Sequence, residues 1–197
     1  NLYGAGLLVQ SLVEKGHSSI AGIFQMDDQR GLERYQGFLD AMQNQGLTVP
    51  DRNICWYTTQ ELDDFRQSRD ISFLKKFLER ITPDCTAFIC EDDFIAWEEL
   101  SLGQEKKIAT HASLSSSLQS TGFKTTSADH SFETTITLAA FNTSYLTTSG
   151  LLRATTLTHQ THQPGTLAAQ MSINKLKGLP VSSQEVPWQL SLPKSHN

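Results

Sequence analysis

Short apolar runs alternate with helical segments along the first half of this chain. The runs at 20–24, 54–57 and 86–90 are bounded by polar residues, which is typical of buried strands. Apolar residues recur at helical spacing between these runs, most clearly over 70–81. Alternation of strand and helix with short connections predicts an α/β fold, with a parallel sheet covered by helices on both faces.

The same criteria assign elements to most of the remaining chain. Helices are expected at 3–15, from about 31 to 46, at 70–81 and at 165–177, and further strands at 135–141 and 186–192. Residues 101–133 are dominated by Ser, Thr and Gly, so we expect an irregular insertion there. Because right-handed crossovers place the carboxyl ends of all strands at one edge of the sheet, ligand-binding residues are expected at that edge.

Charge and apolar content argue against two classes of protein. The net charge is −5 and the Lys and Arg residues are scattered, whereas a domain that binds nucleic acid alone needs a clustered basic face. No stretch approaches the roughly 20 apolar residues that cross a bilayer, and no signal-peptide pattern opens the chain, so no membrane partner is expected. The three cysteines are sparse and lie in apolar runs, which favours a reduced, cytoplasmic protein.

Polar residues that follow the predicted strands are candidates for ligand contacts. The guanidinium fork of Arg34 can span two neighbouring sugar hydroxyls, although a solvated helix arginine is the alternative. Asp92 and Asp93 directly follow a strand; we expect Asp92 to contact a ligand, and Asp93 to cap the next helix or make a structural contact. Asp28 is a further candidate, and Trp56 suits stacking on a pyranose, although such an aromatic is more often part of a core.

Several blocks, in the same order, resemble the lactose/galactose-repressor family of bacterial regulators. The most specific block is 22–38, whose Arg34-x-x-Gly37-Phe38 element is similar to the arabinose-responsive branch of that family. The segment 86–96 resembles the family's apolar strand followed by Asn-Asp, and 155–169 resembles the segment that crosses between lobes. These blocks cover nearly the whole chain.

This resemblance implies a periplasmic-binding-protein-like fold with two α/β lobes, parallel sheets and a sugar in the cleft between them. Residues 1–145 would form the C-terminal lobe, 146–182 the hinge crossing and part of the N-terminal lobe, and 183–197 the closing strand and tail. The opening strands of the first lobe, and a winged-helix domain that contacts operator DNA, would lie upstream of the sequence. The resemblance further implies a homodimer without catalytic residues, metal or cofactor.

Two positions depart from the family pattern. Asp92 stands where asparagine is usual, and Asn142 stands where aspartate is usual. We interpret the pair as a compensating exchange across the cleft. The ligand-binding residues expected on this basis are Arg34, Asp92, Asn142, Asp28 and Trp56, and the implied effector is a small sugar, L-arabinose.

Two other functions remain open. A solute-binding component of a sugar transporter has the same fold. An α/β enzyme could hold Mg²⁺ for phosphoryl transfer through Asp27, Asp28, Asp92 and Asp93, although no phosphate-binding glycine loop or suitably placed lysine accompanies them.

Overall fold

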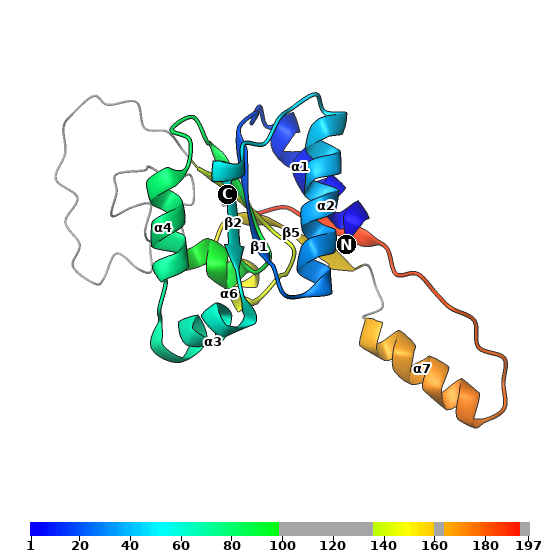
Figure 1. Cartoon of the computed structure of the whole chain (residues 1–197). Coiled ribbons are helices and arrows are strands. Elements are labelled where there is room, and N and C mark those ends of the chain that lie inside the picture. Colours follow the sequence, from blue (N-terminus) through cyan, green and yellow to red (C-terminus); the bar gives the residue numbers. More distant parts are fainter. Residues whose placement is uncertain (99–135, 160–163, 194–197) are drawn as a thin grey trace.

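A computed structural model describes residues 1–98, 136–159 and 164–193. The six strands in these residues form one sheet in the order β2-β1-β3-β4-β5-β6 (Figure 1). The strands are β1 (Ile20–Gln25), β2 (Ile54–Tyr57), β3 (Ala87–Cys90), β4 (Thr137–Ala140), β5 (Ala154–His159) and β6 (Trp188–Ser191). The irregular insertion expected at 101–133 lies outside the described residues.

Neighbouring strands from β2 to β5 are parallel, which confirms the predicted α/β class. β6 runs antiparallel to β5, so the expectation that every strand ends at one edge is wrong for β6. Trp188, the first residue of β6, pairs with His159, the last residue of β5. The chain therefore leaves and re-enters the sheet at the same edge, which forces the returning strand to run in the opposite direction.

Helices cover both faces of the sheet. The described residues form α1 (Leu2–Glu14), α2 (Gln29–Asn44), α3 (Thr59–Ser68), α4 (Ser72–Arg80), α6 (Tyr145–Thr148) and α7 (Pro164–Leu176), and a short 3₁₀ helix spans Asp51–Asn53. α1 and α2 pack on one face, whereas α3, α4 and α6 pack on the other (Figure 1). Among the described residues, no helix combines the length and apolar character that a membrane span requires.

The alternation of side chains along β1 builds a core on each face. Ile20 and Phe24 belong to the core beneath α1 and α2, whereas Ala21 and Ile23 belong to the core beneath α3 and α4. The Phe24 ring packs against Phe38 of α2 with ring centroids 5.6 Å apart, and both side chains are fully buried. Each ring of this size contributes roughly 1.5–3 kcal/mol of burial free energy.

Helix α3 is not predicted by hydrophobic periodicity, because Phe65 is the one buried residue along its length. Its local signal is a capping box. The Thr58 hydroxyl accepts the Glu61 N–H at 3.2 Å, and the Glu61 carboxylate accepts the Thr58 N–H at 2.8 Å. This pairing satisfies two backbone donors at the helix start, so a short polar segment becomes helical.

Helix α7 contrasts with every helix that covers the sheet. None of its residues is buried, and Leu176 is 88% exposed. Figure 1 shows α7 standing away from the sheet. An amphipathic helix normally gains most of its stability from tertiary packing, and α7 has no such packing against the described residues.

Candidate functional site

The carboxyl ends of β1 to β4 bring polar residues to one edge of the sheet. The strand register aligns Gln25 with Tyr57 and Cys90 with Ala140. Glu91 and Phe141 therefore leave their strands side by side. Helix α2 begins at this edge, which places Arg34 over the same strand ends.

Arg34 lies in a buried network rather than on a solvated helix face. It is 7% exposed; its Nη1 lies 3.8 Å from Glu91 Oε2, and its guanidinium carbon lies 4.6 Å from the centre of the Phe141 ring. The Tyr57 hydroxyl donates a hydrogen bond to Glu91 Oε2 at 3.0 Å. The position of Arg34 at the strand edge agrees with the sequence prediction, but its close pairing with a carboxylate was not predicted.

Burial shifts the ionisation of all three groups. It raises the pKa of Glu91, and the nearby Arg34 acts in the opposite direction. It lowers the pKa of Arg34, which Glu91 opposes. Burial, together with the Glu91 charge, raises the pKa of Tyr57, so the phenol keeps its proton and remains a donor. Arg34 Nε and Glu91 Oε1 are buried without a hydrogen-bond partner among the described residues, so the pair is incompletely satisfied.

Gly31 lets the first turn of α2 approach this network. A Cβ atom at Gly31 would overlap the Gln25 carbonyl oxygen and lie 2.9 Å from Glu91 Oε1. Neither contact is compatible with a side chain unless the helix shifts. The close approach of α2 to the sheet, and with it the position of Arg34, therefore depends on glycine at this position.

The two acidic residues after β1 are held by local contacts. Asp28 caps α2 by accepting the Arg30 N–H at 2.7 Å, and its carboxylate pairs with the Arg30 guanidinium at 2.8 Å. The Arg30 side chain lowers the pKa of Asp28 to about 2. Asp27 accepts the Thr59 N–H at 2.9 Å, and this bond lowers the pKa of Asp27.

The two acidic residues after β3 divide their roles in part as the sequence suggested. Asp93 is 1% exposed and accepts the Ser144 N–H at 2.8 Å and the Thr147 hydroxyl at 3.2 Å, so it joins the end of β3 to α6. Asp92 is half-buried, and its Oδ1 accepts the Phe94 N–H at 2.8 Å. Asp92 therefore takes the capping role that sequence analysis expected of Asp93. A carboxylate that caps with one oxygen keeps its second oxygen as an acceptor for a ligand.

The last two candidates lie in different surroundings. Asn142 is exposed immediately beyond β4 at the same strand edge. Trp56 lies within β2, with its ring centroid 4.6 Å from that of Tyr35 and 6.1 Å from that of Phe24. Trp56 thus packs under α2, which fits the core alternative. The structure brings Arg34, Asp28, Asp92 and Asn142 to one edge and sets Trp56 apart from them.

Sequence reasoning missed Glu91 and Tyr57. Tyr57 is the last residue of the apolar run 54–57, and Glu91 is the first residue after the run 86–90, so their positions at strand ends were the available signal. Their pairing across 34 residues of sequence follows only from the adjacency of β2, β1 and β3.

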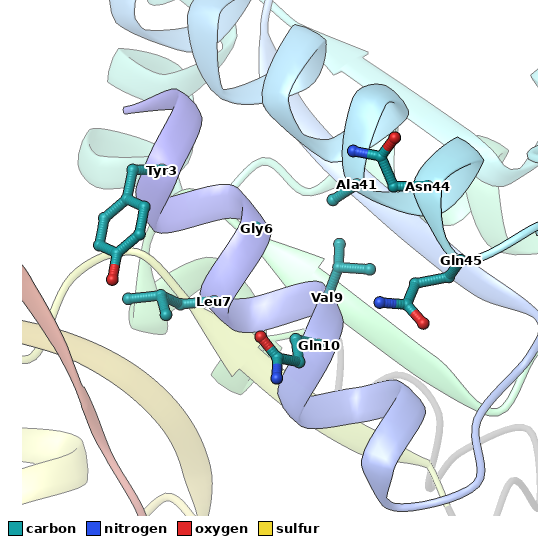
Figure 2. A pocket seen from close by; sticks show the side chains of 8 residues that line it. All are labelled: Tyr3, Gly6, Leu7, Val9, Gln10, Ala41, Asn44 and Gln45. Carbon is teal, nitrogen blue, oxygen red and sulfur yellow. The ribbon is translucent and has the colours of Figure 1, made fainter.

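Two surface hollows are lined by residues other than the candidate ligand-binding residues. One lies between α1 and α2 and is lined by Tyr3, Leu7, Gln10 and Asn44 among others (Figure 2). The other has hydroxyl groups from Thr143, Thr147, Thr148, Thr156 and Ser191 in its wall. Neither contains Arg34, Asp92 or Asn142.

The Mg²⁺ alternative gains no support from the positions of its carboxylates. Asp27 and Asp92 accept backbone amides, Asp28 pairs with Arg30, and Asp93 bonds to α6. Within 1–98, 136–159 and 164–193, no three His, Cys, Asp or Glu side chains gather as a metal ion would require.

A match to a protein family establishes the class of this chain. Residues 9–110, just over half of the sequence, match the model of the periplasmic binding protein-like domain. The chain belongs to this family. The predicted fold class is thereby confirmed.

Two curated relatives are transcriptional repressors. The arabinose metabolism transcriptional repressor of Geobacillus stearothermophilus is 33% identical over 94 residues, which cover 47% of this chain and 25% of that protein. The protein of the same name from Halalkalibacterium halodurans is 23% identical over 163 residues, which cover 83% of this chain and 36% of that protein. The chain thus spans about a third or less of the length of these relatives.

Solved structures show the same fold. A putative LacI-type transcriptional regulator from Bacillus cereus has a TM-score of 0.67 at 18% identity, covering 100% of this chain and 60% of its own. The transcriptional repressor ascG of Escherichia coli has a TM-score of 0.68 at 16% identity, covering 98% of this chain and 60% of its own. All four named proteins are regulators rather than enzymes, in agreement with the expectation of a non-catalytic domain.

Proposed function

We propose that this chain forms one lobe of a sugar-sensing domain in a bacterial transcription repressor. The observation that carries the proposal is the gathering of Arg34, Asp28, Asp92 and Asn142 at the carboxyl edge of a parallel sheet. This edge is where open α/β folds bind ligands. The side chains supply both donors and acceptors, which suits a polyhydroxy compound.

The second wall of the site would come from another lobe. The match covers 60% of the Bacillus cereus regulator's chain, so the remaining part of a two-lobed domain could supply this wall. Helix α7 has no buried residue among the described residues and could pack against such a lobe. Because α6 and β5 share the core and sheet of β1–β4, we place both elements in the same lobe as β1–β4. In this proposal α7 belongs to the N-terminal lobe.

Sugar binding would act on DNA by shifting the lobe geometry. A ligand held by both walls favours the closed arrangement, and only its difference in affinity for the two arrangements can drive the change. Operator DNA would be contacted by a winged-helix domain encoded upstream, because the charge of −5 does not favour contact through this chain. We further propose a cytoplasmic homodimer.

The proposed effector is L-arabinose, on the strength of the two repressor relatives and the Arg34-x-x-Gly37-Phe38 element. The repressor function is favoured over a transporter's solute-binding component because the named relatives are regulators. Release of operator DNA on addition of the sugar distinguishes the two functions.

Isothermal titration of the natural full-length protein against pentoses and hexoses tests the proposal. We expect saturable binding of one pentose, with affinity reduced at least 10-fold by Arg34→Ala and by Asp92→Ala. Arg66→Ala and Asp63→Ala are matched controls, since this exposed pair on α3 lies outside the edge cluster, and they should leave the affinity unchanged. If no sugar in the panel produces saturable heat, the effector is not a free sugar and the proposal is wrong.

A further inference from the structure

Both arginines at the strand edge already have an acidic partner. Arg30 pairs with Asp28 at 2.8 Å, and Arg34 lies 3.8 Å from Glu91. The residues after β1 and β3 add Asp27 and Asp92, so carboxylates outnumber guanidiniums around the site. A phosphate or carboxylate ligand would need a guanidinium whose charge is uncompensated, because such groups bind through charge-assisted, bidentate hydrogen bonds.

Glu91 is the carboxylate that compensates the positive charge of Arg34. Its carboxylate is 5% exposed and is fixed from two sides: by the Tyr57 hydroxyl, which donates to Oε2, and by the first turn of α2 at Gly31. Arg34 in turn is stacked on Phe141. Neither side chain can therefore move away from the other without losing packing, and the positive charge of Arg34 stays compensated.

The pair also contains one donor and one acceptor that have no hydrogen-bond partner among the described residues. Arg34 Nε is a buried donor without a partner, and Glu91 Oε1 is a buried acceptor without a partner among the described residues. Because both atoms are buried, neither gains a partner from a ligand at the open edge, and the charges of Arg34 and Glu91 remain balanced by each other.

We infer that Glu91 is a positioning residue that makes this site select uncharged polyhydroxy ligands and reject sugar phosphates and sugar acids. This inference rests on the proposed sugar-sensing function and names the ligand class of the same site. Glu91 acts through Arg34: it fixes the guanidinium and cancels its charge.

The test is a titration of the natural full-length protein with inorganic phosphate and D-ribose 5-phosphate, alongside L-arabinose. Wild-type protein should show no saturable binding of either phosphate compound at millimolar concentration. Glu91→Gln keeps the side-chain size and removes the charge, so it should bind both phosphate compounds at least 10-fold more tightly than wild type, with affinity that falls as salt is added. Adding Arg34→Gln should abolish the gain.

Glu98→Gln is the matched control, because it removes one carboxylate from the separate pair with Arg69 and leaves Arg34 untouched. It should not bind phosphate. If Glu91→Gln binds phosphate no better than Glu98→Gln, or if wild-type protein binds D-ribose 5-phosphate through Arg34, the inference is overturned. Failure of wild-type protein to bind L-arabinose or any neutral sugar would contradict the proposed function instead, and the phosphate titrations would still decide the role of Glu91.

Tyr57→Phe provides a second variant should Glu91→Gln not fold. It removes the hydroxyl that fixes Glu91 Oε2 and keeps the ring and the Glu91 charge. We expect neutral-sugar affinity to fall several-fold while phosphate remains unbound. Unchanged sugar affinity in this variant would show that the position of Glu91 does not matter and would overturn the inference.

Discussion

Two regions of this chain differ in how they are packed: the body, which consists of β1 to β5 and the helices that cover them, and helix α7. In the body, β1 to β5 are sandwiched by helices whose apolar faces are buried on both sides. Helix α7 has 13 residues, and none of them is buried. A helix of this length is marginal in water when it packs on nothing. The contrast shows that the body carries its own core, whereas α7 buries none of its residues against the described residues.

A core truncation should give the largest difference between the two regions. Phe38→Ala in α2 should lower the free energy of unfolding by about 3–5 kcal/mol, because the ring is fully buried against Phe24. Leu176→Ala in α7 should change it by less than about 0.5 kcal/mol in the 197-residue chain. Urea unfolding of both variants measures the difference. Equal losses would contradict the contrast between body and α7.

Glycine replacements should have opposite signs in the two regions. Gly31→Ala should destabilise the protein by about 1–3 kcal/mol, because the new Cβ would meet the Gln25 carbonyl oxygen. Gly165→Ala lies in α7, where nothing lies within 4 Å of the new Cβ, and should stabilise by roughly 0.4–1 kcal/mol through reduced freedom of the unfolded chain. Melting temperatures measured in parallel would show one fall and one rise; a rise for Gly31→Ala would mean that α2 does not approach the sheet as closely as described.

The smallest expected effect concerns the pH dependence of the body. The pKa of Asp28 lies at about 2 in the folded protein, below its usual value near 3.8. A lowered acid pKa means that the stabilising contribution is present above about pH 4 and is lost as the pH falls towards 2. Asparagine keeps the helix cap, so Asp28→Asn should cost only about 0.5 kcal/mol at pH 7 and should weaken the pH dependence between 4 and 2.

Glu185→Gln serves as the control for this pH effect. Glu185 is exposed between α7 and β6, and no hydrogen bond or ion pair of its side chain is seen within the described ranges. Its replacement should leave the acid unfolding curve unchanged. Identical acid unfolding curves for wild type and Asp28→Asn would show that Asp28 does not contribute to stability in acid.

The sequence predicted β1 to β4 well because each is a short apolar run between polar residues, whereas the threonine-rich β5 was not predicted as a strand. β2 was predicted at its observed residues, and β1 and β3 to within one residue. The position of Arg34 at the strand edge followed from the parallel topology. β6 was predicted as a strand, but its antiparallel direction depends on where the chain re-enters the sheet, which local pattern does not encode.

The partners of the site residues could not be predicted in the same way. The contact of Glu91 with Tyr57 and Arg34 joins three separate elements, and its geometry depends on the close approach of α2 at Gly31. The orientation of Trp56 towards Tyr35 likewise depends on which face of β2 carries α2. Local sequence specifies that such residues are near strand ends or within strands, and only the packed structure specifies what they touch.

In the proposed function, the strand edge of the body and α7 lie on two walls of one sugar-responsive cleft. Hydrogen–deuterium exchange of the natural full-length protein, with and without L-arabinose, measures whether both walls respond to the sugar together. We expect the sugar to slow exchange in the residues that follow β1, β3 and β4 and, in the same experiment, in α7. Saturable sugar binding that leaves these residues unchanged, or protects only the hollow between α1 and α2, would contradict this arrangement.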